Sequence, residues 1–367
     1  MALSKLRSAS FEDTAIYGNR NLIINGAMQI AQRGTSAVAA SANYPSIDRF
    51  KAWGGGDGVF TVEQSTTAPA GFTTSLKAQV TTADTSMAAG QYAQLSQQIE
   101  AQNLQHLEYG TSGAKTLTLS FYVRSSKTGS YSITIYKSDS TEYLFSKSYT
   151  IDSADTWERK IITITPDSNI KASGGAIAND NGIGFYVFWN LAGGTNFDDA
   201  TDNAWSSNTS HYHTSSQVNW MDSTSNNFYI TGVQLEVGEQ ATPFEHRSFG
   251  DELSRCQRYY YKTVADSAAD GFGNGNVNST VRVDGFIPFK QTMRASPTAI
   301  ETNGTAGDYR VNQGGANTTC NAVPTIIVAT KDGCDTRFHV ASGLTVGRGA
   351  VMRCVNSGAF LAWSAEL

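Results

Sequence analysis

Apolar and polar residues alternate in several short stretches of the chain, and this period of two residues is typical of a half-buried β-strand. One stretch places four apolar residues on the same face: Leu117, Leu119, Phe121 and Val123. Residues 130–136 repeat the pattern after a Thr-Gly turn. We therefore predict two strands here that pair as antiparallel neighbours.

Two longer stretches carry more specific information. Ile183–Trp189 is apolar on both faces, as is typical of a central strand that is covered on both sides. In Phe228–Val237 the apolar positions change parity at Gly232, which predicts a β-bulge there, in a strand that closes the first domain. Further short strands are predicted at 22–24, 161–164, 281–289, 325–329, 337–340, 351–355 and 360–363.

One segment has a helical period instead. It begins at Ser248 with a pattern that resembles a capping box, and its apolar stripe consists of Phe249, Leu253, Cys256 and Tyr260. The Gly- and Asn-rich run at 271–278 is expected to interrupt regular structure. The predicted organisation is an N-terminal attachment arm (1–20), a first β-domain (21–247), a linker helix (248–263) and a smaller C-terminal β-domain (264–367).

The composition is typical of an all-β chain, with 16% charged and 11% aromatic residues. The net charge is -5 and the basic residues are scattered, so nucleic acid is not an expected partner. No apolar run approaches the roughly 20 residues of a membrane-spanning helix, so membrane insertion is not expected. No signal-peptide core follows the start, and we expect the chain to stay in the cytoplasm where it is made or to leave by lysis.

The cysteines all lie in the last third of the chain, at Cys256, Cys320, Cys334 and Cys354. We expect free thiols, and a disulfide between Cys320 and Cys334 is the alternative. No nucleophile elbow, zinc-protease motif, phosphate-binding loop or paired carboxylates stand out, so we expect no enzymatic activity. A capsule-degrading enzyme is the alternative, although such enzymes usually rest on a repetitive β-helix and no fixed-period repeat occurs here.

Surface aromatic residues are the main candidates for binding. Sugars are held by stacking their apolar faces on Trp or Tyr, while polar side chains bond the hydroxyls. The predicted glycan-binding residues lie in polar, turn-like contexts, and packing beneath a loop is the alternative for each: Trp53, Trp205, Tyr212 and Trp220. The interval 190–227 is too long for a hairpin and is rich in aromatic residues, so we predict an ordered recognition loop.

Two clusters in this interval are candidates for metal binding. His211 and His213 are two residues apart, so on an extended segment they point to one side and could join copies around a threefold axis to hold a transition metal. Solvated loop histidines are the alternative. The acidic residues Asp198, Asp199 and Asp202 are candidates for Ca²⁺ but lack the spacing of a recognised calcium loop. The main expectation is therefore that no cofactor is required.

Three groups of segments carry a resemblance to a known family. They read NLIINGAM (21–28) with QRG (32–34) and YPSIDRF (44–50), GVQLEVG (232–238) with TPFE (242–245), and ELSRCQRYY (252–260). These segments resemble bacteriophage structural proteins of the tail-fibre type. The resemblance covers about residues 21–262, and it implies a jelly-roll β-sandwich similar to carbohydrate-binding modules, followed by a C-terminal β-domain and without defined catalytic residues.

The resulting expectation is an all-β chain: a jelly-roll β-sandwich, a short helix and a second, smaller β-sandwich-like domain. The expected function is that of a non-enzymatic virion appendage of the tail-fibre or tail-tip type, which recognises host-surface polysaccharide or lipopolysaccharide. The expected partners are other tail or baseplate proteins and two further copies in a homotrimer, with assembly in the host cytoplasm. A purely structural virion component, such as a collar, baseplate or head decoration, is the alternative.

Overall fold

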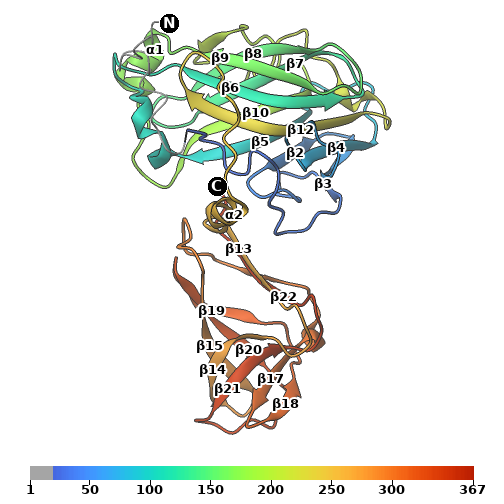
Figure 1. The fold of residues 1–367 in the computed structure, drawn as a ribbon, viewed down its shortest axis with the longest axis vertical. Coiled ribbons are helices and arrows are strands. Elements are labelled where there is room, and N and C mark those ends of the chain that lie inside the picture. The colour runs from blue at the N-terminus through green and yellow to red at the C-terminus, as the bar shows by residue number, and fades with distance from the viewer. Residues whose placement is uncertain (1–19) are drawn as a thin grey trace, which may run out of the picture. The chain divides into compact units, whose positions relative to one another are not determined.

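The computed structural model describes residues 20–367, so the predicted attachment arm, apart from its last residue, lies outside the described residues. The described residues divide into two compact units, residues 20–249 with residue 367, and residues 250–366 (Figure 1). Strands make up most of the regular structure in both units. The predicted fold class, a jelly-roll β-sandwich followed by a short helix and a smaller β-sandwich-like domain, is confirmed.

The first unit consists of two six-stranded antiparallel sheets with one hydrophobic core between them. Sheet 1 has the order β1 (Val38–Ala39), β3 (Val59–Ser65), β4 (Ser75–Thr82), β12 (Asn227–Val237), β6 (Leu117–Ser125) and β9 (Glu158–Ile164). Sheet 2 has the order β11 (Ala204–Ser206), β8 (Tyr143–Ile151), β7 (Gly129–Lys137), β10 (Ile183–Gly193), β5 (Tyr92–Glu100) and β2 (Lys51–Gly55). The short helix α1 (Ser168–Lys171) and three 3₁₀ turns at 101–107, 173–175 and 220–222 connect strands.

The alternation read from the sequence identifies the buried faces correctly. All four predicted inward residues of β6 have no exposed surface: Leu117, Leu119, Phe121 and Val123. The predicted pairing of this strand with β7 is wrong, because β6 pairs with β12 and β9 while β7 pairs with β8 and β10. The short link between β6 and β7 crosses from one sheet to the other. Alternation therefore predicts a strand but not its partner.

The predicted bulge in β12 is confirmed. The register against β6 shifts between Thr231 and Gln234, and Gly232 adopts a φ of 60°. A side chain on this glycine would place its Cβ 2.6 Å from the ring of Phe72. Glycine is needed here for both its backbone conformation and its lack of a side chain.

The second unit has a small and a large antiparallel sheet whose residues share one core. It begins with most of helix α2 (Phe249–Gln257). The small sheet has the order β13 (Tyr260–Val264), β22 (Phe360–Ser364) and β16 (Ile300–Thr302). The large sheet has the order β18 (Ala316–Thr319), β17 (Tyr309–Gln313), β21 (Gly349–Cys354), β14 (Gly271–Ser279), β15 (Arg282–Pro288), β20 (Gly333–His339) and β19 (Thr325–Ala329).

Two local predictions in this unit are wrong. The helix ends at Gln257 instead of continuing to residue 263, because residues 260–264 pair along their whole length with β22. The Gly- and Asn-rich run 271–278 does not interrupt the fold but forms β14, which lies inside the large sheet. Its neighbours β21 and β15 supply the hydrogen bonds that its weak strand propensity does not predict.

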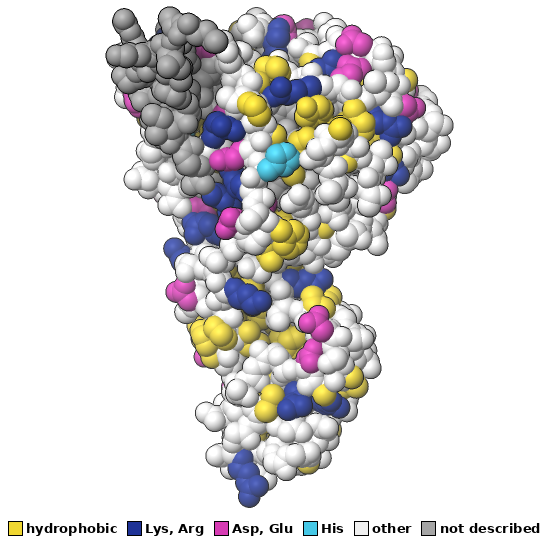
Figure 2. Space-filling model, in the orientation of Figure 1, with side chains coloured by type: hydrophobic (Ala, Val, Ile, Leu, Met, Phe, Trp, Pro, Cys, Tyr) yellow, Lys and Arg dark blue, Asp and Glu magenta, His cyan; other side chains and the backbone are white. Residues whose placement is uncertain are grey.

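The four cysteines are buried free thiols. On the face shown in Figure 2, basic and acidic side chains are interspersed rather than gathered by sign. Within residues 20–367, no helix is long and apolar enough to cross a membrane.

Candidate functional site

The outer face of sheet 2, turned away from the core, carries aromatic residues where a solvated face normally carries polar ones. In β10, Val187 and Trp189 point into the core and have no exposed surface. The residues between them, Tyr186 and Phe188, therefore lie on the outer face. Tyr186 pairs directly with Tyr136 of β7, which extends the aromatic surface across the sheet.

A hollow of about 260 Å³ opens on this face. It is lined by one amide and seven aromatic side chains, from β2, β5, β7, β10 and the loop after β10: Trp53, Tyr92, Gln94, Tyr136, Tyr186, Phe188, Phe197 and Tyr212. We call this site the aromatic hollow. Its lining residues are spread over 160 positions of the chain, from residue 53 to residue 212, so only the folded sheet brings them together.

The rings form a continuous surface. Tyr186 stacks on Tyr136 and on Phe188, with ring centroids 5.5 Å apart in both pairs and interplanar angles of 20° and 5°. Tyr212 meets Phe188 edge to face at 5.3 Å, and Trp53 lies 6.3 Å from Phe188 on the other side. Such contacts hold each ring in a defined orientation.

Polar contacts fix the ring of Trp53 at one wall. Its indole N–H donates a hydrogen bond of 2.8 Å to the Ser96 hydroxyl on the neighbouring strand β5. The Lys51 ammonium lies 4.1 Å from the centre of the indole ring, in cation–π geometry. Trp53 is thus held in place by its neighbours and remains partly exposed.

A buried amide fixes the loop that forms the opposite wall. Asn190 donates hydrogen bonds to the carbonyl of Tyr212 (3.2 Å) and to the hydroxyl of Thr134 (2.9 Å), and it accepts one from Gln94 (2.8 Å). The Ser146 hydroxyl also donates to the carbonyl of Tyr212, at 2.8 Å. The interval 190–227 is therefore ordered. It is tied to the sheet through Tyr212, which lies between His211 and His213.

Three tyrosine hydroxyls of the hollow, those of Tyr136, Tyr186 and Tyr212, stay neutral over the physiological pH range. Burial raises the pKa of Tyr212 to about 12, with smaller contributions from Tyr186, Glu142 and Tyr92. Burial and the Glu142 carboxylate also raise the pKa of Tyr186 and that of Tyr136. No carboxylate is among the described residues that line the hollow. The site therefore offers flat rings, neutral hydroxyls and one amide.

The structure separates the four predicted aromatic residues into two pairs. Trp53 and Tyr212 line the hollow. Trp220 does not, because it is fully buried and packs edge to face on Phe60 at 5.7 Å. Trp205 is 8% exposed, and its indole donates a hydrogen bond of 3.1 Å to the carbonyl of Thr165. For these two tryptophans the prediction of a surface role is wrong, because Trp205 packs into the core from the edge strand β11 and Trp220 from a 3₁₀ turn.

The two histidines do not share a face. His213 is buried, and its Nδ1 lies 3.1 Å from the carbonyl of Thr214. His211 is partly exposed and lines a different, smaller hollow with Asn208 beside it. The segment is a loop instead of the extended strand on which the metal prediction depended. The described residues contain no group of three potential metal ligands.

One carboxylate of the predicted calcium cluster is occupied by contacts within the protein. Asp202 accepts a hydrogen bond from the backbone N–H of Ser148 (2.6 Å) and forms an ion pair with Lys147 (2.7 Å). Although burial acts in the opposite direction, these contacts hold the pKa of Asp202 below its usual value. The carboxylate therefore serves a contact between the loop and β8.

Sequence reasoning missed six of the eight residues that line the hollow: Tyr92, Gln94, Tyr136, Tyr186, Phe188 and Phe197. The signal was present in β10, where the apolar character of both faces was interpreted only as a sign of a central strand. The outward aromatic residues of β10, Tyr186 and Phe188, together with Tyr136 of β7, would have indicated an exposed aromatic face.

The chain was compared with known proteins. No family model matches it, and no curated protein sequence shows significant similarity to it. Among solved structures it is similar to the enzymatically active domain of tailspike protein 4 of bacteriophage CBA120, at 14% identity and a TM-score of 0.33, over 60% of this chain and 22% of that chain. The chain thus spans about a fifth of that tailspike chain.

Carbohydrate-binding modules are also among the similar structures. The family 11 module of cellulosomal cellulase Lic26A-Cel5E of Clostridium thermocellum matches at 11% identity and a TM-score of 0.28, over 57% of this chain and 98% of that chain. TmCBM61, solved in complex with β-1,4-galactotriose, matches at 12% identity and a TM-score of 0.28, over 60% of this chain and 99% of that chain. The likeness at these scores concerns the β-sandwich architecture and does not extend to function.

Proposed function

We propose that the first unit is a carbohydrate-binding module that holds a saccharide in the aromatic hollow. The observation that carries this proposal is the set of seven aromatic side chains that line one hollow on the outer face of sheet 2. Aromatic faces that remain accessible to solvent cost free energy unless a ligand or partner covers them. The exposed rings of the hollow therefore indicate a ligand or partner that covers them.

A sugar ring fits this chemistry better than a charged or purely apolar ligand. Its C–H face stacks on an aromatic ring, and its hydroxyls exchange hydrogen bonds with neutral groups such as the Tyr186 and Tyr212 hydroxyls and the Gln94 amide. The volume of about 260 Å³ lies just below the roughly 300–1,000 Å³ typical of ligand pockets. The hollow therefore holds a short stretch of a saccharide, with the rest of the chain outside.

The proposed role is binding without hydrolysis. Glycoside hydrolysis requires a pair of carboxyl groups on either side of the scissile bond, about 5–10 Å apart. The described lining of the hollow has none. This supports a recognition module over the alternative of a capsule-degrading enzyme.

The biological setting is a further part of the proposal. The three groups of segments that resemble tail-fibre proteins support a virion appendage of the tail-fibre or tail-tip type, which uses the hollow to recognise host polysaccharide or lipopolysaccharide. Other tail or baseplate proteins and two further copies in a homotrimer are the proposed partners. Several weak sites on one particle would act together through their high effective concentration.

The test is saccharide binding by the purified full chain, measured on a saccharide array and then by calorimetry. Trp53→Ala and Tyr186→Ala are each expected to weaken binding about tenfold, the loss of one stacking contact of about 1.4 kcal/mol. The matched control is Trp157→Ala, which removes a partly exposed tryptophan that packs on Tyr229 at the other sheet. Unchanged affinity in both hollow variants, or no saccharide bound by the folded wild type, would favour the purely structural role.

A further inference from the structure

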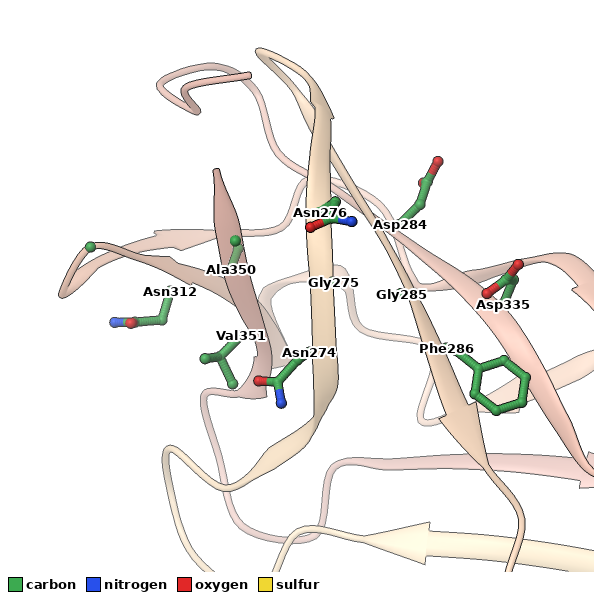
Figure 3. A pocket seen from close by; sticks show the side chains of 12 residues that line it. Asn274, Gly275, Asn276, Asp284, Gly285, Phe286, Asn312, Asp335, Ala350 and Val351 are labelled. Atoms are coloured by element: carbon green, nitrogen blue, oxygen red, sulfur yellow. The ribbon is translucent and has the colours of Figure 1, made fainter. Parts of the chain in front are cut away.

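A second concavity lies on the large sheet of the other unit. It has a volume of about 680 Å³ and crosses the outer face of five neighbouring strands, β17, β21, β14, β15 and β20. Figure 3 shows Asn312 of β17 on one side of β21 and Asn274 and Asn276 of β14 on the other, with the Phe286 ring beside Asp335 farther along. We call this concavity the polar furrow. Its lining differs from that of the aromatic hollow, because it contains three amides and two carboxylates but only one aromatic ring.

Two glycines among the lining residues let β14 and β15 approach each other closely. A Cβ on Gly275 would lie 2.5 Å from the carbonyl oxygen of Asp284, and a Cβ on Gly285 would lie 2.3 Å from that of Asn274. The two strands therefore approach more closely than side chains would permit. The apparently featureless Gly- and Asn-rich sequence of β14 thus has a specific structural use.

The aromatic ring at the edge of the furrow also depends on a glycine. The ring of Phe286 lies over Gly333 of the neighbouring strand β20. A Cβ at position 333 would lie 2.1 Å from this ring, so only glycine leaves room for it. Phe286 is nevertheless 50% exposed. A large apolar ring is thus held against the sheet while half of its surface remains open.

Two arginines lie next to the other end of the furrow. Arg310 of β17 is directly opposite Arg353 of β21 in the strand register. The residues beside them in these strands, Val311 and Met352, point into the core and have no exposed surface. Arg310 and Arg353 therefore point outward, on the face that also carries Asn312 of the furrow.

Neither guanidinium forms an ion pair with any residue in 20–367. Arg353 donates one hydrogen bond of 3.3 Å, to the carbonyl of Ala269. The Nε atoms of both arginines are buried without a hydrogen-bond partner in the described structure. Like charges directly opposite each other on a sheet are unfavourable. An anion between them would remove this repulsion.

The same sheet face shows how an arginine is neutralised where no ligand is needed. Arg337 of β20 donates two hydrogen bonds to the Asp284 carboxylate, at 2.8 and 3.0 Å. This bidentate contact lowers the pKa of Asp284. Arg310 and Arg353 differ from Arg337 because neither has a carboxylate partner within the described part of the chain.

We propose that the polar furrow is a second ligand site and that its ligand is an anionic saccharide. The carboxylate, phosphate or sulfate group of the ligand binds between Arg310 and Arg353, because guanidinium groups form paired hydrogen bonds with such anions. The saccharide then extends past Asn312 and Asn274 toward the ring of Phe286. Three strand spacings of about 4.8 Å separate β17 from β15, a distance of about 14 Å that suits a short oligosaccharide.

The test uses the full chain and four polymers: polygalacturonate for carboxylate, phosphomannan for phosphate, dextran sulfate for sulfate and neutral dextran as the reference. The wild type is expected to bind one anionic polymer at least tenfold more tightly than dextran. Arg310→Gln combined with Arg353→Gln is expected to abolish that difference, and the polymer affected identifies the anionic group. Phe286→Ala is expected to weaken binding of the same polymer severalfold.

The charge-matched control is Lys331→Gln combined with Arg348→Gln, which removes two exposed positive charges outside the furrow. Equal losses in the control and in the arginine variant would mean non-specific attraction and would overturn the proposal. Anionic polymers that bind no better than dextran would overturn it as well. Trp53→Ala must leave this binding unchanged, so failure here is distinguishable from failure of the aromatic hollow.

Discussion

The two units present two different surfaces built on the same scaffold. In both, the candidate site lies on the outer face of an antiparallel sheet whose inner face forms the core. The aromatic hollow is lined by stacked rings and neutral hydroxyls, whereas the polar furrow has glycines, amides, two carboxylates and a neighbouring pair of arginines. The pleat of the sheet determines which positions face outward, and the residue types at those positions determine which ligand chemistry the face suits.

A second contrast exists within sheet 2 itself. Trp189 and Phe188 are consecutive residues of β10, yet Trp189 packs in the core against Phe50 and Phe121 while Phe188 forms the floor of the hollow. An aromatic residue in a strand therefore has no fixed role. The parity of its position decides between stability and binding.

The largest expected effect distinguishes core tryptophans from the tryptophan of the hollow. Trp220→Ala should lower the free energy of unfolding by about 3–5 kcal/mol, because it leaves a large cavity in the core. Trp53→Ala should lower it by less than about 1.5 kcal/mol, since the ring is partly exposed. Urea unfolding measures both, and similar losses would remove the distinction between the two sets of aromatics.

A smaller effect is expected from a side chain placed between the strands of the furrow. Gly285→Ala should destabilise the second unit by about 1–3 kcal/mol, because its Cβ would lie 2.3 Å from a backbone oxygen. Hydrogen exchange should increase in β14 and β15. The matched variant Gly307→Ala, where a Cβ has open space, should leave exchange in these strands unchanged.

Salt should separate the two sites further. Raising the salt concentration from 50 mM to 500 mM should weaken binding of an anionic polymer at least tenfold, because ions screen the charges of the partly exposed arginines. Binding of a neutral saccharide in the hollow should change by less than twofold, since its contacts are uncharged. Isothermal calorimetry at the two concentrations tests both, and equal salt sensitivity would contradict the contrast between the faces.

The smallest expected effect concerns pH and the loop beside the hollow. Burial lowers the pKa of His213, although a hydrogen bond to the carbonyl of Thr214 and the nearby Asp198 oppose it. The unfolded chain therefore binds a proton before the folded one does. The stability that depends on neutral His213 is complete above the ordinary pKa of about 6.5 and is lost as the pH falls toward the lower folded value.

Thermal unfolding between pH 7 and pH 5 measures this effect, and stability is expected to fall with pH. His213→Gln should make the dependence shallower without abolishing it, because burial also lowers the pKa of His106. His106→Gln combined with His213→Gln should flatten it further. A wild type whose stability rises on acidification through this range would contradict the assignment.

The sequence by itself determined several of the strands and, in these, the buried face. The alternation around Leu119 and Phe121 predicted which side chains enter the core, and the change of parity at Gly232 predicted the bulge. These features depend on neighbouring residues, because the two-residue period of a strand and the conformational freedom of glycine are local properties. The polar context of Trp53 and Tyr212 suggested partly exposed rings, which the structure shows, but the same reasoning fails for Trp205 and Trp220.

Only the tertiary structure decided strand partners, loop burial and the composition of both sites. Neither the separation of β6 and β7 into different sheets nor the burial of Trp220 in the core follows from the local pattern. The run 271–278 has weak strand propensity and becomes a strand because β21 and β15 pair with it. The strands that pair with a segment and the loops that cover it are distant in sequence. The hydrophobic period of one strand therefore carries no information about its partners or its coverage.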